Sequence, residues 1–413
     1  MKRSLFFLFA ASVAFAADGS LAATPPMGWN SWDSYGTTVT EAEVKANADA
    51  MAAKLKSHGW QYIVVDIQWS DAQAKAHGYR PNAELTMDGQ GRLTPAVNRF
   101  PSAAGGKGFG PLAAYIHGKG LKFGIHIMRG VPRRAPVAAQ IADTSSICRW
   151  NSDMYGVDMS KPGGQEYYDS IVRLYAGWGV DYIKADDMAI PLHAAEIEAL
   201  HKAIVKSGRP IVLSLSPGPA DIAKADFYAA NANLWRVSGD LWDRWQDVLK
   251  TFGLMEKWSK YSKPGGWPDA DMLPLGHIGL RAERGNDRMS LLTRDEQQTL
   301  MTLWCITRSP LMMGGDLPTS DAFTLSLLTN DEVLAVNQKG TNAHQITANG
   351  GEIVWESEGP AGEKYVALFN TGEQPAPAHF DLKLSKPRDL WTGQPVGPDM
   401  PVPAHGARLI GAR

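Results

Sequence analysis

The chain has 413 residues, of which 44% are hydrophobic and 20% are charged, and its formal net charge is −2. A charge this close to zero excludes a global electrostatic attraction to nucleic acid or to an anionic membrane surface. At about 150 residues per domain, the length predicts two or three domains, or one barrel with an appended domain. The 14 tryptophans favour a ligand with apolar ring faces, although core packing is the commoner role of a single tryptophan.

The first residues have the pattern of an export signal. Lys2 and Arg3 precede an apolar run over 5–13 and a small-residue segment at 14–16, which is the order of a signal peptide. We therefore expect residues 1–23 to hold a signal peptide and the tail of the mature chain, and the protein to be exported to the periplasm or the medium. No apolar run reaches the roughly 20 residues that cross a bilayer, so no membrane-spanning segment is predicted.

Between residues 24 and 338, strand-like and helix-like segments alternate. The run 62–65 is continuously apolar, as in a strand buried on both faces, and it ends in Asp66. Comparable runs occur at 121–126, 181–186, 210–214 and 233–237. Helices are expected between them, and two begin with capping boxes, from Thr40 to Glu43 and from Thr293 to Glu296. About eight strand-helix units predict an α/β fold, a (β/α)8 TIM barrel with elaborated loops.

One connection within this barrel is unusually long. Residues 128–164 show little periodicity, and a loop of that length is usually either functional or disordered. Trp150 and Tyr155 favour an ordered lid over a site.

Beyond about residue 340 the sequence no longer shows helical periodicity. Short strand candidates at 353–355, 365–369 and 380–384 are separated by Gly and Pro turns. We expect residues 339–413 to form a small antiparallel β-sandwich domain.

The two cysteines, Cys148 and Cys305, exclude a disulfide framework. One bridge between them stays open. No Cys or His spacing resembles a zinc site, and no cofactor is predicted.

The segment 181–188 carries the strongest candidate site. Strand side chains alternate between faces, so Lys184 and Asp186 share one face and Asp187 lies on the other. Strand ends in an α/β barrel hold the active site, which makes Asp186 a candidate nucleophile. The alternative is structural: Asp186 would cap the next helix and Lys184 would form an ion pair.

Other predicted strand ends supply Asp66, His126, Arg236, Asp240 and Asp271. Paired carboxylates at the mouth of a barrel suit glycoside hydrolysis, in which one attacks the sugar and the other protonates the leaving oxygen. Lys184 would keep Asp186 ionised, because a nearby opposite charge favours the charged form.

Asp240 is the candidate acid. Trp235, Trp242 and Trp245 surround it in the sequence, and burial among them would raise its pKa toward the range that an acid catalyst needs. Alternatively, Asp240 only caps its helix.

Two other classes of protein stay open at this point. Asp66, His126, Asp186, Asp187 and Asp271 could ligate the divalent metal of a barrel hydrolase, although the set contains no His pair at ligand spacing. A non-catalytic sugar-binding protein would explain the tryptophans but not a lysine beside a carboxylate.

Several ordered sequence blocks resemble the α-galactosidases of glycoside hydrolase family 27, a retaining family. They span nearly the whole mature chain and lie at 25–32, 62–66, 184–186, 236–240, 265–273 and 308–311. The resemblance implies that Asp186 is the nucleophile and Asp240 the acid/base of an exo-acting α-galactosidase. It implies a carbohydrate substrate with a terminal α-galactoside and no cofactor. The substrate-binding residues expected from it are Trp32, Asp66, His126, Lys184, Ser216, Arg236 and Asp271.

The chain departs from that family at four places. Ile67 replaces the second of two acids that bind sugar hydroxyls, and an unpaired buried polar group costs about 1–3 kcal/mol, enough to change sugar preference. Met188 replaces a cysteine, so the family's loop disulfide is not expected. His126 stands in place of a tyrosine. Residues 214–217 read Ser-Leu-Ser-Pro where the α-galactosidases place a glutamate. These departures leave α-N-acetylgalactosaminidase or β-L-arabinopyranosidase as alternatives; β-L-arabinopyranose keeps the ring hydroxyls of galactose without the hydroxymethyl group.

Overall fold

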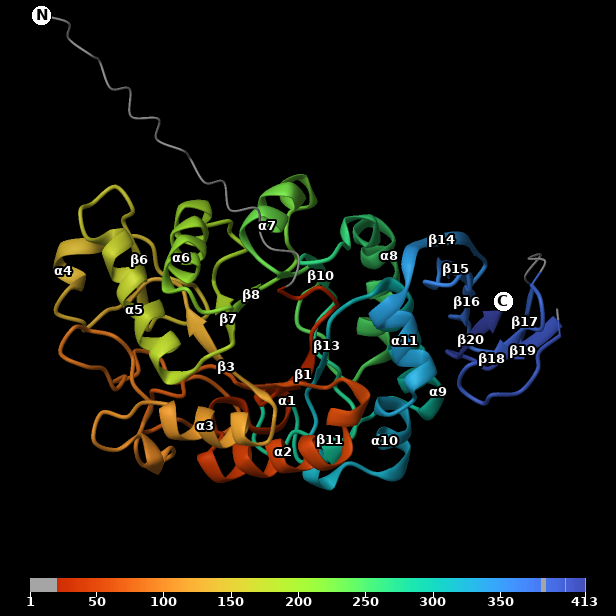
Figure 1. Ribbon diagram of the computed structural model, residues 1–413, viewed down its shortest axis with the longest axis horizontal. Helices are drawn as coiled ribbons and strands as arrows, with labels where there is room; N and C mark the ends of the chain where they lie inside the picture. The colour runs from red at the N-terminus through yellow and green to blue at the C-terminus, as the bar shows by residue number, and fades with distance from the viewer. Residues whose placement is uncertain (1–20, 380–383, 398, 413) are drawn as a thin grey trace, which may run out of the picture.

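Eight short parallel strands form the centre of the larger domain (Figure 1). The structure is a computed structural model that describes residues 21–379, 384–397 and 399–412, so most of the segment 1–23, which is predicted to hold the signal peptide, lies outside the described residues. The strands are almost entirely buried, which accounts for their continuous apolar sequences. They are β1 (Met27–Asn30), β2 (Tyr62–Val65), β3 (Lys122–Met128), β7 (Tyr182–Asp186), β8 (Val212–Leu215), β9 (Leu234–Arg236), β10 (Trp267–Asp269) and β13 (Leu311–Met313).

The eight strands close into a barrel. Each pairs with its neighbour in chain order, and β13 returns to β1. On the other side a parallel bridge joins Leu273, just after β10, to Met313. Two backbone hydrogen bonds hold this seam, from Leu273 N to Met312 O at 2.8 Å and from Gly314 N to Leu273 O at 3.0 Å. The predicted (β/α)8 barrel is confirmed.

Helices follow each strand and surround the barrel (Figure 1). They are α2 (Glu41–Lys54), α3 (Gly110–Gly118), α5 (Gly164–Trp178), α6 (Ala194–Ser207), α7 (Ala225–Asn231), α8 (Trp245–Trp258), α9 (Arg294–Thr307), α10 (Ala322–Leu328) and α11 (Asp331–Lys339). Both predicted capping boxes are present: Thr40 with Glu43 begins α2, and Thr293 with Glu296 begins α9.

Shorter elements lie in the connections. The long segment after β3 is ordered into a three-stranded antiparallel sheet, in the order β4, β6, β5. The short elements are α1 (Trp32–Tyr35), α4 (Ala138–Ile141), β4 (Val131–Pro132), β5 (Ala142–Asp143), β6 (Met154–Val157), β11 (His277–Ile278), β12 (Arg288–Met289), and 3-10 turns at 36–38, 56–58, 101–103, 222–224, 259–261 and 317–319.

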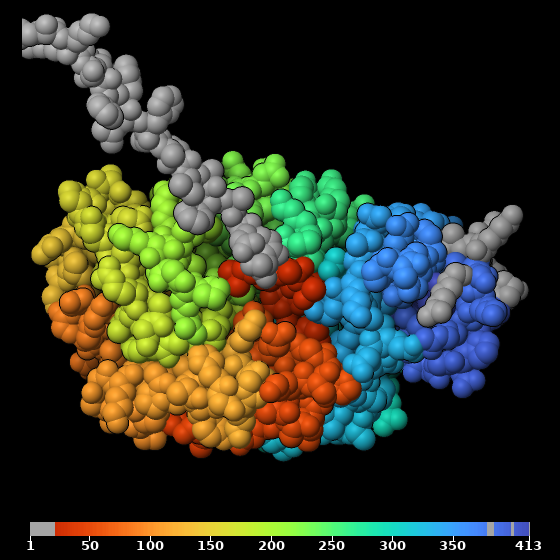
Figure 2. Space-filling view, viewed as in Figure 1, coloured from red at the N-terminus to blue at the C-terminus, as the bar shows by residue number. Residues whose placement is uncertain are grey.

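The C-terminal residues form an antiparallel β domain that packs against the last part of the barrel (Figure 2). Its five-stranded sheet has the order β14, β15, β16, β20, β18, and a two-stranded sheet pairs β17 with β19. Most of the strand candidate 380–384 lies outside the described residues. The strands are β14 (Thr341–Asn349), β15 (Glu352–Glu358), β16 (Lys364–Asn370), β17 (Ala376–His379), β18 (Arg388–Asp389), β19 (Asp399–Val402) and β20 (Ala407–Ala412).

Both faces of the five-stranded sheet are covered. Val366 and Leu368 point into a small core of the β domain, whereas Ala367 and Phe369 belong to the core that it shares with the barrel. This alternation follows the period of two in a strand. Phe369 contacts Phe252 of α8 edge to face, with 4.9 Å between ring centroids.

Both cysteines, Cys148 and Cys305, are buried and free, so the bridge that the sequence left open does not form. Within the described ranges, no helix combines the length and apolarity needed to cross a membrane.

Candidate active site

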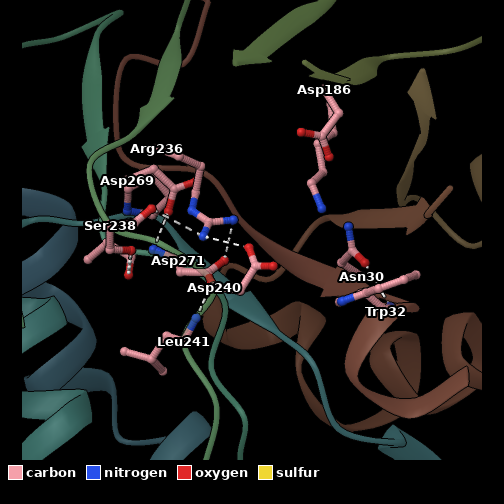
Figure 3. A network of polar contacts seen from close by, with 12 residues as sticks. Asn30, Trp32, Asp186, Arg236, Ser238, Asp240, Leu241, Asp269 and Asp271 are labelled. Carbon is pink, nitrogen blue, oxygen red and sulfur yellow. Dashed lines mark hydrogen bonds and ion pairs between the residues drawn. The ribbon is translucent and has the colours of Figure 1, made fainter. Parts of the chain in front are cut away.

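The carboxyl ends of the barrel strands enclose one pocket, and the predicted site residues gather there. Figure 3 labels Trp32, Asp186, Arg236, Asp240 and Asp271 among them. Eight of the nine predicted residues line the pocket, and His126 contacts Asp186 from the neighbouring strand. The lining residues are Trp32, Asp33, Asp66, Tyr79, Lys184, Asp186, Ser216, Arg236, Asp240, Leu241, Trp242, Asp271 and Met272. Residues separated by more than two hundred positions therefore form a single site.

Asp186 ends β7 with its carboxylate facing this pocket. Its Oδ2 lies 3.1 Å from His126 Nε2, and its Oδ1 accepts a hydrogen bond from Asp187 N at 3.1 Å. Burial alone would raise the pKa of Asp186, but the hydrogen bond and charge of His126, together with Lys184, lower it below its ordinary value. Asp186 is therefore held as an ionised, pocket-facing carboxylate, which suits a nucleophile.

Asp66 is the direct ion-pair partner of Lys184. Lys184 Nζ lies 2.9 Å from Asp66 Oδ2, which also accepts a hydrogen bond from Asn30 Nδ2 at 2.7 Å. Burial opposes ionisation of Asp66, but Lys184 and His126 lower the pKa of Asp66 well below its ordinary range. The expectation that Lys184 keeps Asp186 ionised holds in part: Lys184 lowers the pKa of Asp186, but less than His126 does.

Arg236 connects the other two acids of the pocket. Its Nη1 lies 2.8 Å from Asp271 Oδ1, and its Nη2 lies 3.2 Å from Asp240 Oδ1 (Figure 3). Asp271 Oδ2 also accepts a hydrogen bond from Leu241 N at 2.7 Å. Burial raises the pKa of Asp271, Arg236 opposes the rise, and Asp240 adds to it. One guanidinium thus fixes the position of both carboxyl groups.

The exposure of the Asp240 side chain differs from the burial predicted from the sequence. Its side chain is 48% exposed, whereas the neighbouring Trp235, Trp242 and Trp245 are buried. The predicted burial of Asp240 among these tryptophans is wrong, because the indoles pack inward and the loop turns the carboxyl toward the pocket and solvent. Asp240 does not cap a helix either, since α8 begins at Trp245 after Arg244.

Asp187 has a structural role, as its position on the opposite strand face indicated. Arg129 Nε and Nη2 lie 2.9 and 2.8 Å from Asp187 Oδ2, and Arg129 Nη1 lies 2.6 Å from Glu196 Oε1. Asp187 is absent from the pocket lining, and its φ of 57° turns the chain away from the strand. Asp186 caps no helix, because α6 begins after His193.

Two residues of the pocket lining, one acidic and one aromatic, were not predicted from the sequence. Asp33 follows Trp32 on a short helix, and Tyr79 lies in a loop where no strand period points to a face. Burial raises the pKa of Tyr79 well above 10, and the nearby charge of Asp186 adds to that rise. The sequence signal available was adjacency to Trp32 for Asp33, and an aromatic side chain in a loop next to a strand end for Tyr79.

Ile67 is buried beside Asp66, whose Oδ1 accepts a hydrogen bond from Ile67 N at 2.9 Å. The position therefore supplies a buried apolar side chain next to an acid of the pocket wall. In the part of the chain that the structure describes, no group of three or more His, Cys, Asp or Glu side chains is arranged to hold a metal ion.

We expect Asp33 to make a pH-dependent contribution to the free energy of unfolding. It is 3% exposed, its Oδ2 has no hydrogen-bond partner among the described residues, and burial and the charge of Asp271 raise its pKa well above the ordinary value. A raised pKa means that the folded protein binds this proton more tightly than the unfolded chain. The stabilisation is thus full below the unfolded pKa of about 4 and is lost as pH rises through the folded pKa.

We expect Asp33→Asn, a neutral isostere, to weaken the decline of the free energy of unfolding as pH rises above about 4. Urea unfolding at several pH values measures this slope. The exposed Asp226→Asn is the matched control and should follow the parent protein. Parallel pH slopes for the parent and Asp33→Asn would contradict the raised pKa of the buried Asp33.

Comparisons with known proteins bear on the chemistry of this pocket. A family model described as alpha galactosidase A matches residues 24–161 and 156–339, and a model of the alpha galactosidase C-terminal beta sandwich domain matches 349–411. Alpha-galactosidase 2 of Arabidopsis thaliana is 30% identical over 390 residues, covering 91% of this chain and 84% of the relative. The alpha-galactosidase of Cyamopsis tetragonoloba is 31% identical, and the match covers 91% of this chain and 82% of that relative. Among solved structures, a β-L-arabinopyranosidase of glycoside hydrolase family 27 from Geobacillus stearothermophilus is 51% identical, with a TM-score of 0.93 and coverage of 95% and 97%.

Proposed function

The chain belongs to glycoside hydrolase family 27, and from this membership and the pocket geometry we propose that it is a retaining, exo-acting α-galactosidase. It releases terminal α-linked galactose from oligo- or polysaccharides. The observation that carries the proposal is the pair of carboxyl groups in one pocket: Asp186, ionised and fixed by His126, and Asp240, open to solvent beside Arg236. The pattern of residues 1–23 supports export of the enzyme.

Membership of this retaining family supports a double displacement, for which the pocket supplies two carboxyl groups. Asp186 attacks the anomeric carbon and forms a covalent glycosyl-enzyme, while Asp240 protonates the departing glycosidic oxygen. Asp240 then takes a proton from water, which attacks the same carbon and frees Asp186. Its 48% exposure allows Asp240 to exchange protons with solvent between turnovers. Lys184 and Asp66 hold each other in the wall that receives the sugar hydroxyls.

A second candidate activity is favoured by one specific residue. Ile67 offers no hydrogen bond where the family's α-galactosidases carry an acid, and β-L-arabinopyranose lacks the hydroxymethyl group of galactose. The 51% identity to the Geobacillus β-L-arabinopyranosidase supports the same candidate. Ser216 lies in the pocket wall, within the segment 214–217 where the family's α-galactosidases carry a glutamate. A small residue there keeps α-N-acetylgalactosaminidase as a third candidate activity.

We expect measurable kcat/KM on an aryl α-D-galactoside, which tests the proposal directly. The aryl β-L-arabinopyranoside and aryl α-N-acetylgalactosaminide are compared in the same assay. A higher kcat/KM on the arabinopyranoside would assign the chain to the second candidate, and inactivity on all three substrates would reject all three candidate activities.

Ile67→Asp should raise the ratio of kcat/KM on the galactoside to kcat/KM on the arabinopyranoside by about 10-fold or more, since a restored hydrogen bond is worth about 1–3 kcal/mol. Ile67→Val is the control that keeps the position apolar.

A further inference from the structure

A continuous series of aromatic rings leads from the pocket to the surface. Trp32 and Tyr79 both line the pocket and stack on each other, with 5.3 Å between ring centroids and 22° between their planes. Tyr79 in turn contacts Trp150, with 5.5 Å between centroids and 51° between planes. Trp150 ends the series and is 39% exposed. An indole surface is thus open to solvent one ring contact away from the lining of the pocket.

The loops that carry Tyr79 and Trp150 are cross-linked to each other. Asp153 Oδ2 accepts a hydrogen bond from Gln68 Nε2 at 2.7 Å, and its Oδ1 accepts one from Ala83 N at 2.9 Å. Arg133 Nη1 donates to Asn82 Oδ1 at 2.5 Å and to Ser152 O at 3.2 Å. Since Asp153 and Gln68 are buried, these bonds hold the exposed indole in place before any ligand arrives.

A polar cavity of about 410 Å³ is lined by the next residues of the same two loops. Asn82, Arg133 and Ser152 provide polar groups on its wall, and the Arg133 guanidinium lies over the Tyr155 ring at 4.9 Å from the centroid. Trp150 is not in the lining of this cavity, but Ser152 on its wall lies two residues further along the chain. An exposed aromatic face near hydrogen-bonding side chains suits a pyranose ring, because the carbon face of the ring is apolar and its rim carries hydroxyls. A core-packing role does not account for the exposed face of Trp150.

We propose that Trp150, backed by Tyr79, is the stacking platform of a subsite for the neutral pyranose ring on the leaving-group side of the scissile bond. This inference rests on the proposed function and deepens it. The terminal sugar occupies the pocket between Asp186 and Asp240, and the next ring of the glycan lies against the indole. The subsite binds the leaving sugar and takes no part in the proton transfers.

Two substrates with the same terminal sugar separate this subsite from the catalytic site. Melibiose has a glucose ring on the leaving side, whereas α-galactosyl fluoride has no ring there. We expect Trp150→Ala to lower kcat/KM on melibiose about three- to tenfold, the range for loss of one aromatic stacking contact, and to leave kcat/KM on the fluoride unchanged. Trp150→Phe should keep most of the activity on melibiose. Ile147→Ala is the matched control, since Ile147 lies in the same loop and is 38% exposed.

Equal losses on both substrates would show a structural role for Trp150, and unchanged kcat/KM on both would show that no ring binds there. Either result overturns the subsite. If the parent protein fails to hydrolyse α-galactosyl fluoride, the proposed galactosidase activity fails instead. The same comparison with β-L-arabinopyranosyl fluoride and a disaccharide of that sugar then decides the role of Trp150.

Discussion

Asp186→Asn is expected to lower kcat by about 10⁴-fold or more, the scale of removing a catalytic group from a hydrolase. An amide oxygen does not form the glycosyl-enzyme, whereas the nearly isosteric side chain still accepts the hydrogen bond from His126 Nε2. The thermal unfolding transition should therefore change little. Rates on an aryl galactoside and the midpoint of thermal unfolding are the two measurements required.

A smaller substitution at the same position tests the role more directly. Asp186→Gly opens space for azide, which should restore turnover of an activated substrate and give a glycosyl azide of β configuration. Asp187→Asn is the matched control, because its carboxylate pairs with Arg129 and does not line the pocket. Substantial turnover by Asp186→Asn, or a failure of azide to restore turnover by Asp186→Gly, would remove Asp186 from the nucleophile role.

Asp240→Ala is expected to produce a loss that depends on the leaving group. Glycosides with poor leaving groups need the proton and should lose about 10²–10⁴-fold in kcat/KM, the usual contribution of general acid catalysis. Aryl glycosides with acidic phenols need little protonation, so their kcat/KM should fall far less. Their kcat should still fall, because the glycosyl-enzyme then waits for water without a general base.

A series of aryl galactosides with phenols of graded pKa measures this dependence. Azide should accelerate the slow second step in Asp240→Ala, since it attacks the intermediate without needing a base. The same loss for every leaving group would show that Asp240 only positions Arg236, from which its Oδ1 lies 3.2 Å.

Periodic features of the sequence were sufficient to predict the barrel. Buried strands such as 62–65 read as apolar runs because both faces are covered, and the capping boxes at Thr40 and Thr293 act within one helical turn. The placement of Lys184 and Asp186 on one face followed from the period of two. These patterns depend only on residues close together in the sequence, so they can be interpreted without knowledge of the tertiary structure.

The partners of the site residues depend on register between distant strands. His126 reaches Asp186 because β3 pairs with β7 so that His126 lies opposite Lys184, which precedes Asp186 by two residues on the same strand face. No local pattern encodes that pairing. The exposure of Asp240 and the pocket positions of Asp33 and Tyr79 depend on the paths of loops. Loop paths are set by side-chain contacts such as Tyr79 with Trp150, which form only in the folded chain.

The seam of the barrel has a consequence for how the enzyme loses activity. Leu273, whose bridge to Met313 closes the sheet, lies two residues after Asp271, whose carboxylate is bound to Arg236. The backbone at Asp271 has a φ of 95°, and its carbonyl accepts a hydrogen bond from Trp304 Nε1 at 2.8 Å. The closure of the barrel and the position of the proposed acid Asp240 are thus coupled, because Asp271, two residues before the seam, pairs with the guanidinium of Arg236 that lies beside Asp240.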